Sequence, residues 1–258
     1  MDWLDLNYTL VERQKGARIV VLPETSLPML TDQLPEGYLN ALHQGVSRRK
    51  ADLIVGVFTR EGRSIYNSAL SLGTSPAQAY HKHHLVPFGE YSPPLFGWFF
   101  ELAHIPMADQ TRGATHQAPL AIAGQKIAIN ICYEDVFGEE LLSALPEASL
   151  MLNMSNLAWY GDSHAQPQHL QIARLRALET GRPMLRSTNT GMTALIQPDG
   201  RVEAVLPAFT AGALRVEVRG FAGQTPYSRW ANWPVILLAG GCILWAALLR
   251  RRSQQKPA

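Results

Sequence analysis

Short apolar runs alternate with amphipathic stretches along most of the chain, and each pattern predicts its own kind of element. The apolar runs, rich in Val, Ile and Leu, predict strands at residues 18–22, 53–59, 66–72, 126–132, 150–154, 183–189, 193–196 and 214–218. Helical spacing of apolar residues predicts helices at residues 1–16, 35–49, 139–145 and 164–182. Strands that alternate with helices and are apolar throughout are typical of an α/β domain whose sheet or sheets are covered by helices on both sides.

The pattern changes near the C-terminus. Residues 230–249 contain no charged side chain, and Arg250, Arg251 and Arg252 follow directly. A bilayer is spanned by about 20 apolar residues, and basic residues mark the cytoplasmic end of such a helix. We therefore predict a transmembrane helix at 230–250 and a cytoplasmic tail at 251–258, with a buried helix of a soluble protein as the alternative.

Composition narrows the class of protein. With 47% hydrophobic and 17% charged residues, the chain is suited to a well-buried core or a membrane segment. Its formal net charge is +2, and the sequence has no basic face of the kind that binds nucleic acid. Cys132 and Cys242 are far apart and the second lies in the C-terminal apolar run, so we expect neither a disulfide nor a zinc site built on paired cysteines.

Three residues with reactive side chains follow strands or strand-like runs. Glu24 follows VVLP, Lys82 follows QAYH, and Cys132 follows IAINI. Because α/β folds commonly build their sites at the carboxyl ends of neighbouring strands, we expect the three side chains to converge. Taken singly, each has an ordinary structural explanation: a glutamate in a turn, a solvated lysine and a small buried cysteine.

A carboxylate, an amine and a thiol together favour nucleophilic catalysis. A thiol attacks as the thiolate, so Cys132 needs a base or a cation nearby. Glu24 can accept the thiol proton as general base, and Lys82 can favour the thiolate and stabilise an oxyanion. The backbone N–H after Cys132 is a candidate second oxyanion donor. The set predicts attack on an acyl carbon and a thioester intermediate.

Longer segments around these residues resemble the nitrilase superfamily. They read VVLPETSLP, YHKHHLVPFGEYSP and INICYEDVFG, followed by NMSNLAWYG and STNTGMTALIQPDG. The closer resemblance is to the apolipoprotein N-acyltransferase family, through HLVPFGEY after the lysine, ICYED at the cysteine and TPYSRWANWP before the terminal helix. The resemblance covers residues 5–250. It implies a nitrilase-like αββα sandwich, here at residues 1–222, followed by one C-terminal transmembrane helix.

The resemblance also implies roles for individual residues. Glu24 matches the family's general base, Lys82 its catalytic lysine and Cys132 its nucleophile. A second glutamate that supports the lysine, and two essential neighbours of the cysteine, are matched by Glu90, Tyr133 and Glu134.

Two further groups are candidates for the surroundings of the site. Asn156, Trp159 and Tyr160 follow another predicted strand and are expected to line the pocket, with a structural turn as the alternative. An aromatic loop is expected to be a lid that dips into lipid, or else to pack on its own domain; it carries Phe88, Tyr91, Phe96, Trp98, Phe99 and Phe100.

By resemblance, the enzyme takes an acyl chain from a phospholipid and transfers it to the free α-amine of a diacylglyceryl-cysteine at the N-terminus of an apolipoprotein. This implies a bacterial inner-membrane acyltransferase with its catalytic domain on the periplasmic side. No cofactor is implied, and His81, His83 and His84 lack a carboxylate at ligand spacing, so no metal site is predicted. A nitrilase-type amidase and an inactive truncated remnant are the alternatives.

The resemblance is incomplete at the N-terminal end. The family has a multi-helix membrane domain ahead of its nitrilase domain, and that domain opens with a strand and a tryptophan-bearing segment. No part of this sequence corresponds to them. We therefore expect a C-terminal fragment that lacks the first strand, in which the neighbouring strand has an unpaired edge.

Overall fold

The structure is a computed structural model that describes residues 3–93 and 110–254. Its strands form two sheets. The first has the order β1-β3-β4-β5, with β2 also paired to β3; its strands are β1 (Ile19–Val21), β2 (Leu27–Leu30), β3 (Asp52–Glu61), β4 (Ser64–Gly73) and β5 (Gln78–His81). The second has the order β11-β10-β9-β8-β7-β6; its strands are β6 (Leu120–Ile122), β7 (Gln125–Ile131), β8 (Leu150–Ser155), β9 (Met184–Thr188), β10 (Thr193–Ile196) and β11 (Val202–Leu206).

The two sheets pack face to face over a shared apolar core. Side chains alternate across a strand, and in β7 the residues Ile127, Ile129 and Ile131 face the first sheet, where they join Ile54 and Ala69. Strands β7, β8 and β9 are parallel to one another, and their central residues are almost wholly buried. This explains why β7 and β8 are apolar along most of their length.

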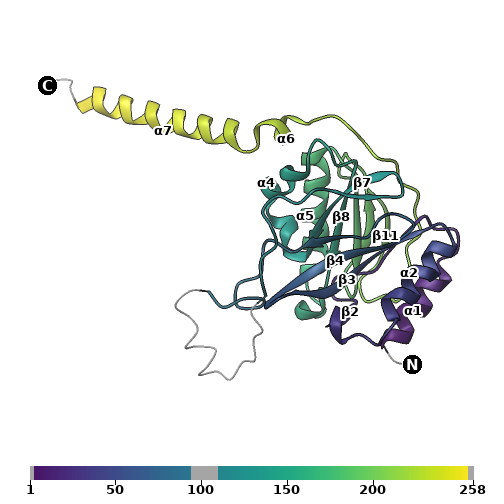
Figure 1. Cartoon of the computed structure of the whole chain (residues 1–258). Helices are drawn as coiled ribbons and strands as arrows, with labels where there is room; N and C mark the ends of the chain where they lie inside the picture. Colours follow the sequence, from purple (N-terminus) through teal and green to yellow (C-terminus); the bar gives the residue numbers. More distant parts are fainter. Residues whose placement is uncertain (1–2, 94–109, 255–258) are drawn as a thin grey trace.

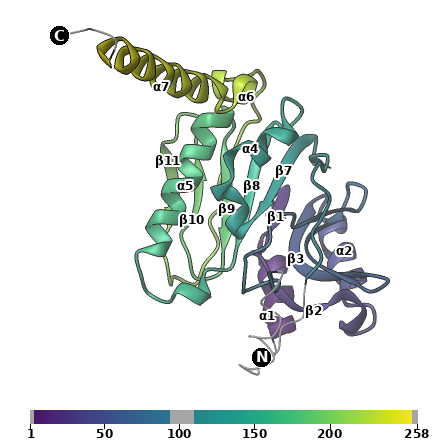
Figure 2. The same ribbon diagram turned by 90° about the vertical axis from the view of Figure 1, so that its left-hand side faces the viewer.

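Helices cover the outer face of each sheet. The first sheet is covered by α1 (Trp3–Arg13) and α2 (Tyr38–Arg48), whose Val11, Leu42 and Val46 pack on strand β3. The second is covered by α4 (Gly138–Leu141) and α5 (Ala165–Thr180), which pack on Ala128, Met151 and Met184. Figure 2 shows the resulting α-β-β-α order of layers. The predicted nitrilase-like αββα sandwich is therefore confirmed.

Short 3₁₀ helices connect several strands to the elements that follow. They are η1 (Thr31–Gln33), η2 (Cys132–Val136), η3 (Leu142–Ala144) and η4 (Ala158–Tyr160). Two of them, η2 after β7 and η4 after β8, stand at the carboxyl ends of adjacent parallel strands. They present their side chains at one edge of the second sheet.

The C-terminal part leaves the sandwich as a helix. After α6 (Pro226–Trp230), helix α7 (Trp233–Gln254) projects away from the two sheets (Figure 1). Among the described residues, one helix is long and apolar enough to cross a membrane: Trp233–Arg250, with a mean hydropathy of 1.7 and no buried residues. The connection to α7 is anchored, because Arg182 Nη2 donates to the carbonyl of Gly223 at 2.9 Å and Thr225 Oγ1 donates to that of Glu179.

Some predicted elements differ from those observed. The strand predicted at Leu214–Val218 is wrong: the segment has no regular structure, although Val218 packs beside the core between the sheets. Its alternating side chains gave the strand pattern, but its backbone is not part of either sheet. The predicted helix at 139–145 is divided into α4 and η3. Strands β2, β6 and β11 were not predicted, and β5 was predicted only as the strand-like run before Lys82.

Candidate functional site

Glu24 lies in the turn after β1, directly over strand β3. Gly56 makes this approach possible, because a Cβ there would lie 2.3 Å from the carbonyl oxygen of Pro23 and 2.7 Å from Glu24 Cα. The next residue, Thr25, has a φ of +52°, a left-handed conformation that is uncommon outside glycine. The backbone is thus folded so that the Glu24 side chain, only 6% exposed, points into the interior.

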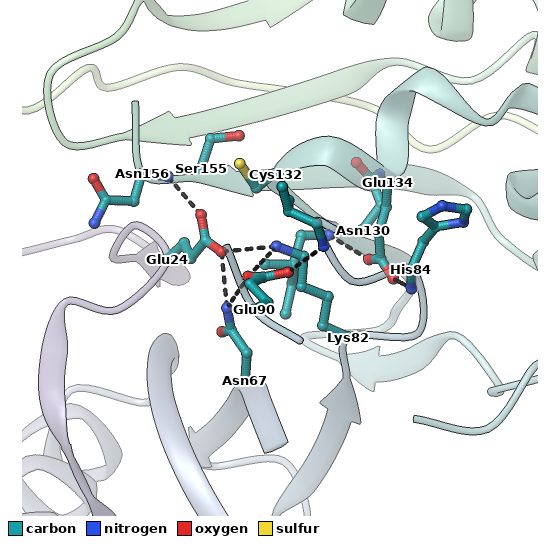
Figure 3. Close-up of polar contacts among 12 residues, drawn as sticks. Glu24, Asn67, Lys82, His84, Glu90, Asn130, Cys132, Glu134, Ser155 and Asn156 are labelled. Atoms are coloured by element: carbon teal, nitrogen blue, oxygen red, sulfur yellow. Dashed lines mark hydrogen bonds and ion pairs between the residues drawn. The ribbon is translucent and has the colours of Figure 1, made fainter. Parts of the chain in front are cut away.

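The Glu24 carboxylate accepts hydrogen bonds at both oxygens. Oε1 accepts from Asn67 Nδ2 at 2.8 Å and from Lys82 Nζ at 3.2 Å. Oε2 accepts from the backbone N–H of Asn156 at 2.7 Å. A carboxylate offers about four acceptor positions. Glu24 therefore keeps capacity for one more proton donor while its orientation is fixed from three sides (Figure 3).

Lys82 directly follows β5 and is 1% exposed. Its backbone N–H donates to the Asn67 carbonyl at 2.8 Å, and its carbonyl accepts from the N–H of Gly113 at 2.9 Å. Its Nζ lies 3.2 Å from Glu24 Oε1 and 2.7 Å from Glu90 Oε1. Burial alone lowers the pKa of Lys82, but the negative charges around it outweigh burial and raise that pKa. The ammonium is therefore a fixed positive charge inside the site.

Glu90 reaches Lys82 from a tight turn. The backbone N–H groups of Gly89 and Glu90 both donate to the carbonyl of Val86, and Phe88 within the turn has a φ of +62°. The N–H of Val86 in turn donates to Glu90 Oε2 at 2.8 Å. The turn thus leaves Glu90 Oε1 free to pair with the ammonium of Lys82.

Cys132 directly follows β7 and begins η2 with a φ of +54°. In Figure 3 its sulfur lies at the top of the cluster, with the carboxylate of Glu24 and the ammonium of Lys82 below it. Burial and the charge of Glu24 raise the pKa of the Cys132 thiol, while the charge of Lys82 opposes them. The thiol is therefore protonated at neutral pH, and it would require a base to act as a nucleophile.

Glu134 is fully enclosed and ties the end of β7 to the loop that carries Lys82. Its carboxylate accepts from the backbone N–H groups of Ile131 at 2.6 Å, His83 at 2.6 Å and His84 at 3.0 Å. Tyr80 Oη also donates to it at 3.0 Å. Burial raises the pKa of Glu134, and the hydrogen bonds from the backbone oppose this rise. Since Glu134 lies two residues after Cys132, these hydrogen bonds hold the segment of the cysteine beside the loop that follows Lys82.

Tyr133 lies on the same short helix as Cys132 and Glu134. Its ring makes edge contacts with His84, at 5.7 Å between ring centroids, and with Phe137, at 5.1 Å. His84 also stacks on Phe137 at 3.5 Å. These contacts fix the outer side of η2.

The three candidate pocket residues have different surroundings. Asn156 contributes its backbone N–H to Glu24, and its Oδ1 accepts from Asn189 Nδ2. Tyr160 is half exposed, and burial and the charge of a Cys132 thiolate raise its pKa. Trp159 is 87% exposed. Asn156 thus binds a member of the cluster directly, whereas Trp159 points largely to the outside.

The neighbouring histidines bind three separate partners. His81 Nδ1 lies 2.8 Å from Ser68 Oγ, His83 Nδ1 lies 2.8 Å from the Gly113 carbonyl, and His84 Nδ1 lies 2.9 Å from Glu140 Oε1. Over residues 3–93 and 110–254, no three His, Cys, Asp or Glu side chains are grouped to hold a metal ion. Cys132 and Cys242 are both free thiols.

Only part of the aromatic loop lies among the described residues. Phe88 is 49% exposed, and the Tyr91 ring lies under the guanidinium of Arg112, 4.8 Å from its carbon. The remaining aromatic residues of the predicted lid lie outside the described residues; they are Phe96, Trp98, Phe99 and Phe100.

The expected convergence occurs, but not along neighbouring strands of one sheet. Glu24 and Lys82 follow β1 and β5, which are at opposite ends of the strand order in the first sheet, and Cys132 follows β7 in the second. The site therefore lies where the two sheets meet. The prediction treated the strands as adjacent because pairing between distant segments is not visible in local pattern.

Sequence reasoning missed several polar residues around the cluster. Asn67 donates to both Glu24 and Glu90, and Asn153 donates to the Cys132 carbonyl at 3.2 Å. Asn153 interrupts a largely apolar strand, and that interruption was an available signal, whereas Asn67 lies in a strand that also carries several serines. Three more residues behind the cysteine were also missed: the buried Asp135 and Arg186 and the partly buried His169.

The comparison with family models and the comparison with curated proteins agree with each other. The family model for carbon-nitrogen hydrolases matches residues 3–227. A protein of Nitrosomonas europaea named apolipoprotein N-acyltransferase is 47% identical over 96% of this chain and 51% of its own length. One of the same name from Chromobacterium violaceum is 47% identical over 92% of this chain and 47% of its own length. The chain thus spans about half the length of the curated relatives it matches.

Solved structures share the fold at low sequence identity. A carbon-nitrogen hydrolase from Helicobacter pylori G27 is 16% identical, with a TM-score of 0.59 over 79% of this chain and 78% of its own. A variant of an amidase from Nesterenkonia, described as belonging to the nitrilase superfamily, is 20% identical, with a TM-score of 0.59 over 80% of both chains. At this identity, the similarity concerns the fold alone.

Proposed function

Since the chain belongs to the carbon-nitrogen hydrolase family, we propose that it is the catalytic part of an apolipoprotein N-acyltransferase. It transfers an acyl chain from a phospholipid, through a thioester on Cys132, to the N-terminal amine of a diacylglyceryl-cysteine. The observation that carries the chemistry is the junction of Glu24, Lys82 and Cys132 between the two sheets. The substrates follow from the relatives that bear this name and match almost the whole chain.

The first step forms the thioester. Glu24 takes the thiol proton through its remaining acceptor position, and the thiolate of Cys132 attacks the ester carbonyl carbon of the donor. The carbonyl oxygen becomes an oxyanion, which the ammonium of Lys82 stabilises. The tetrahedral intermediate collapses as the C–O bond breaks. Glu24 returns its proton to the leaving oxygen, and a lysophospholipid departs.

The second step releases the acyl chain. The neutral α-amine of the acceptor attacks the thioester carbon, and Glu24 accepts a proton from the attacking nitrogen. Lys82 again stabilises the oxyanion. The C–S bond breaks, an amide is formed, and the proton on Glu24 returns to the sulfur of Cys132. Each residue thus ends the cycle in its starting protonation state.

The supporting residues hold these reacting groups in fixed positions. Glu90 and Asn67 hold the ammonium of Lys82 and the carboxylate of Glu24 in fixed positions. Glu134 fixes the end of the strand that precedes Cys132. The backbone N–H of Tyr133, at the start of η2, is the second donor to the oxyanion.

The membrane helix places this chemistry beside its lipid substrate. Helix α7 crosses the bacterial inner membrane, with Arg250, Arg251 and Arg252 at the cytoplasmic end. The catalytic domain then faces the periplasm. The donor lipid and the lipid-modified acceptor are both anchored in that membrane, so they reach the site by diffusion in its plane.

The test uses the whole chain, purified in detergent micelles that contain phospholipid. Intact mass should increase by one acyl chain, and this increase should be absent in Cys132→Ala and present in Cys242→Ala. Addition of a diacylglyceryl-cysteine peptide should remove the acyl chain from the protein and attach it to the peptide amine. An acyl chain that still attaches to Cys132→Ala would refute Cys132 as the nucleophile.

The same assay separates the two alternatives. A nitrilase-type amidase would release ammonia from simple amides and would not pass an acyl chain to the peptide. An inactive remnant would give neither product although the protein is folded. Acyl transfer to the peptide is the outcome that supports the proposal.

A further inference from the structure

Cys132 has a strained backbone that is held from three sides. Its φ of +54° is unfavourable for a residue with a side chain, and such strain persists only where the surroundings over-determine it. Before the cysteine, the N–H of Ile131 donates to Glu134 Oε2. At the cysteine, its carbonyl accepts from Asn153 Nδ2. After it, Asp135 binds the second sheet through its side chain.

The partner of Asp135 is Arg186, in the middle of β9. Arg186 Nη1 donates to Asp135 Oδ2 at 3.1 Å, and neither side chain has exposed surface. Arg186 is the cross-strand neighbour of Asn153, which is the neighbour of Asn130. A row of buried polar residues therefore crosses three parallel strands behind the cysteine, on the side covered by α5.

His169 of α5 completes this group. Arg186 Nη2 lies 2.8 Å from His169 Nδ1, and because a guanidinium can only donate, Nδ1 must be the acceptor. The ring proton is then on Nε2, which lies 3.4 Å from Asp135 Oδ1. Arg186 Nη1 also donates to the backbone carbonyl of His169 at 3.3 Å. The three side chains form a closed ring of contacts between η2, β9 and α5.

We propose that Asp135, Arg186 and His169 form a positioning unit that holds the strained elbow at Cys132 and so aims its thiol at Glu24 and Lys82. The unit touches no substrate; it acts through the backbone of η2. The inference rests on the proposed role of Cys132 as nucleophile. The positioning role gives a reason for the buried ion pair of Asp135 and Arg186, since burying two charges costs free energy.

The charges around Asp135 set the expected electrostatic effects. Burial, with a smaller contribution from the charge of Glu134, raises the pKa of Asp135 to about 7. The charges of Arg186 and Arg176 oppose this rise. The negative charge of Asp135 raises the pKa of the Cys132 thiol. Burial lowers the pKa of His169 to about 3, so its imidazole is uncharged near neutral pH. Substitution of His169 therefore removes its side-chain hydrogen bond with Arg186 without removing charge.

The first experiment measures alkylation of Cys132 by iodoacetamide in the full chain, with Cys242→Ala as background. Below the pKa of the thiol, the alkylation rate is proportional to the thiolate fraction, about tenfold per pKa unit. At about pH 8.5, where Asp135 of the wild type is ionised, Asp135→Asn and Arg186→Met should each change the rate by at least about threefold, because the released elbow moves the thiol relative to Glu24 and Lys82. The exposed control Glu147→Gln should keep the wild-type rate. An unchanged rate in both folded variants would overturn the proposal.

The second experiment uses the uncharged member of the unit. His169→Asn keeps an acceptor near the position of Nδ1, whereas His169→Leu keeps none. Acyl-enzyme formation should fall by about tenfold or more in His169→Leu, since small misplacements of reacting groups are costly, and should be largely restored in His169→Asn. Thermal unfolding is recorded for both variants. Equal acyl-enzyme formation by the two folded variants would contradict the positioning role.

The two readouts separate this inference from the proposed function. If the wild-type chain forms no acyl-enzyme while the two variants change the alkylation rate, the proposed function fails and the unit's action on Cys132 stands. If acyl-enzyme forms and the alkylation rate is unchanged in both variants, the proposed function stands and the positioning unit is rejected.

Discussion

Replacement of Gly56 by alanine tests whether the position of Glu24 is set by the strand beneath it. The added Cβ would lie 2.3 Å from the carbonyl oxygen of Pro23, 2.6 Å from the nitrogen of Thr25 and 2.7 Å from Glu24 Cα. Ordinary contacts begin at 3.4 Å. All three neighbours are backbone atoms, so no side chain can turn aside, and the turn must move by roughly 1 Å to reach ordinary contact distances.

This displacement has two expected consequences. Overpacking of a dense interior costs about 1–3 kcal/mol of unfolding free energy, which lowers the melting temperature by about 2–4 °C per kcal/mol in a chain of this size. A shift of about 1 Å in a catalytic group lowers the rate by about a hundredfold. Acyl-enzyme formation in Gly56→Ala should therefore fall far more than stability does.

The assay follows the increase in intact mass over time in phospholipid micelles, beside thermal unfolding. Gly212→Ala is the control, because its Cβ would meet only the two methyl carbons of Leu206, at 3.5 and 3.6 Å. The control should keep wild-type activity. A folded Gly56→Ala protein that forms acyl-enzyme at the wild-type rate would refute the claim that this close approach positions Glu24.

Three further predictions follow from the charges and hydrogen bonds of the site. Because the pKa of the Cys132 thiol is raised above its ordinary value, its alkylation rate should increase about tenfold per pH unit through the neutral range; a plateau below about pH 8.5, the ordinary thiol pKa, would contradict this. Glu134→Gln leaves backbone N–H groups without a charged acceptor and should cost about 1–3 kcal/mol in denaturant unfolding, whereas the exposed control Glu147→Gln should cost little. Asn67→Ala removes a 2.8 Å hydrogen bond to Glu24 and should lower the rate of acyl-enzyme formation about tenfold or more, since hydrogen bonds to charged groups are worth about 1.5–3 kcal/mol. An unchanged rate in folded Asn67→Ala would show that Glu24 is held without it.

The main elements of the fold could be predicted from hydrophobic pattern because each buries a continuous apolar face. Strands β3, β7 and β8 are long and apolar, and they lie where they were expected. The missed strands β2, β6 and β11 have three to five residues each, too few to establish a period. The segment 214–218 shows the opposite failure, since an extended chain can alternate its side chains without pairing its backbone.

The reactive residues of the site could be predicted, whereas the contacts among them could not. Glu24, Lys82 and Cys132 stood out because charged or reactive side chains directly follow buried strands. Their assignment to two different sheets depends on pairing between distant segments, which no local pattern reports. For the same reason, the pairing of Asp135 with Arg186 was not visible, since 51 positions separate them in the chain.

The division of the site between two sheets makes assembly of the site depend on the packing of one sheet against the other. The segments of the first sheet supply the carboxylates and the ammonium, and those of the second supply the thiol. A folding intermediate in which only one sheet has formed therefore carries an incomplete set of catalytic groups. The proposed reaction with acyl chains therefore requires that Ile54 and Ala69 pack against Ile127 and Ile129. Each half of the sandwich on its own is expected to be inert towards lipid.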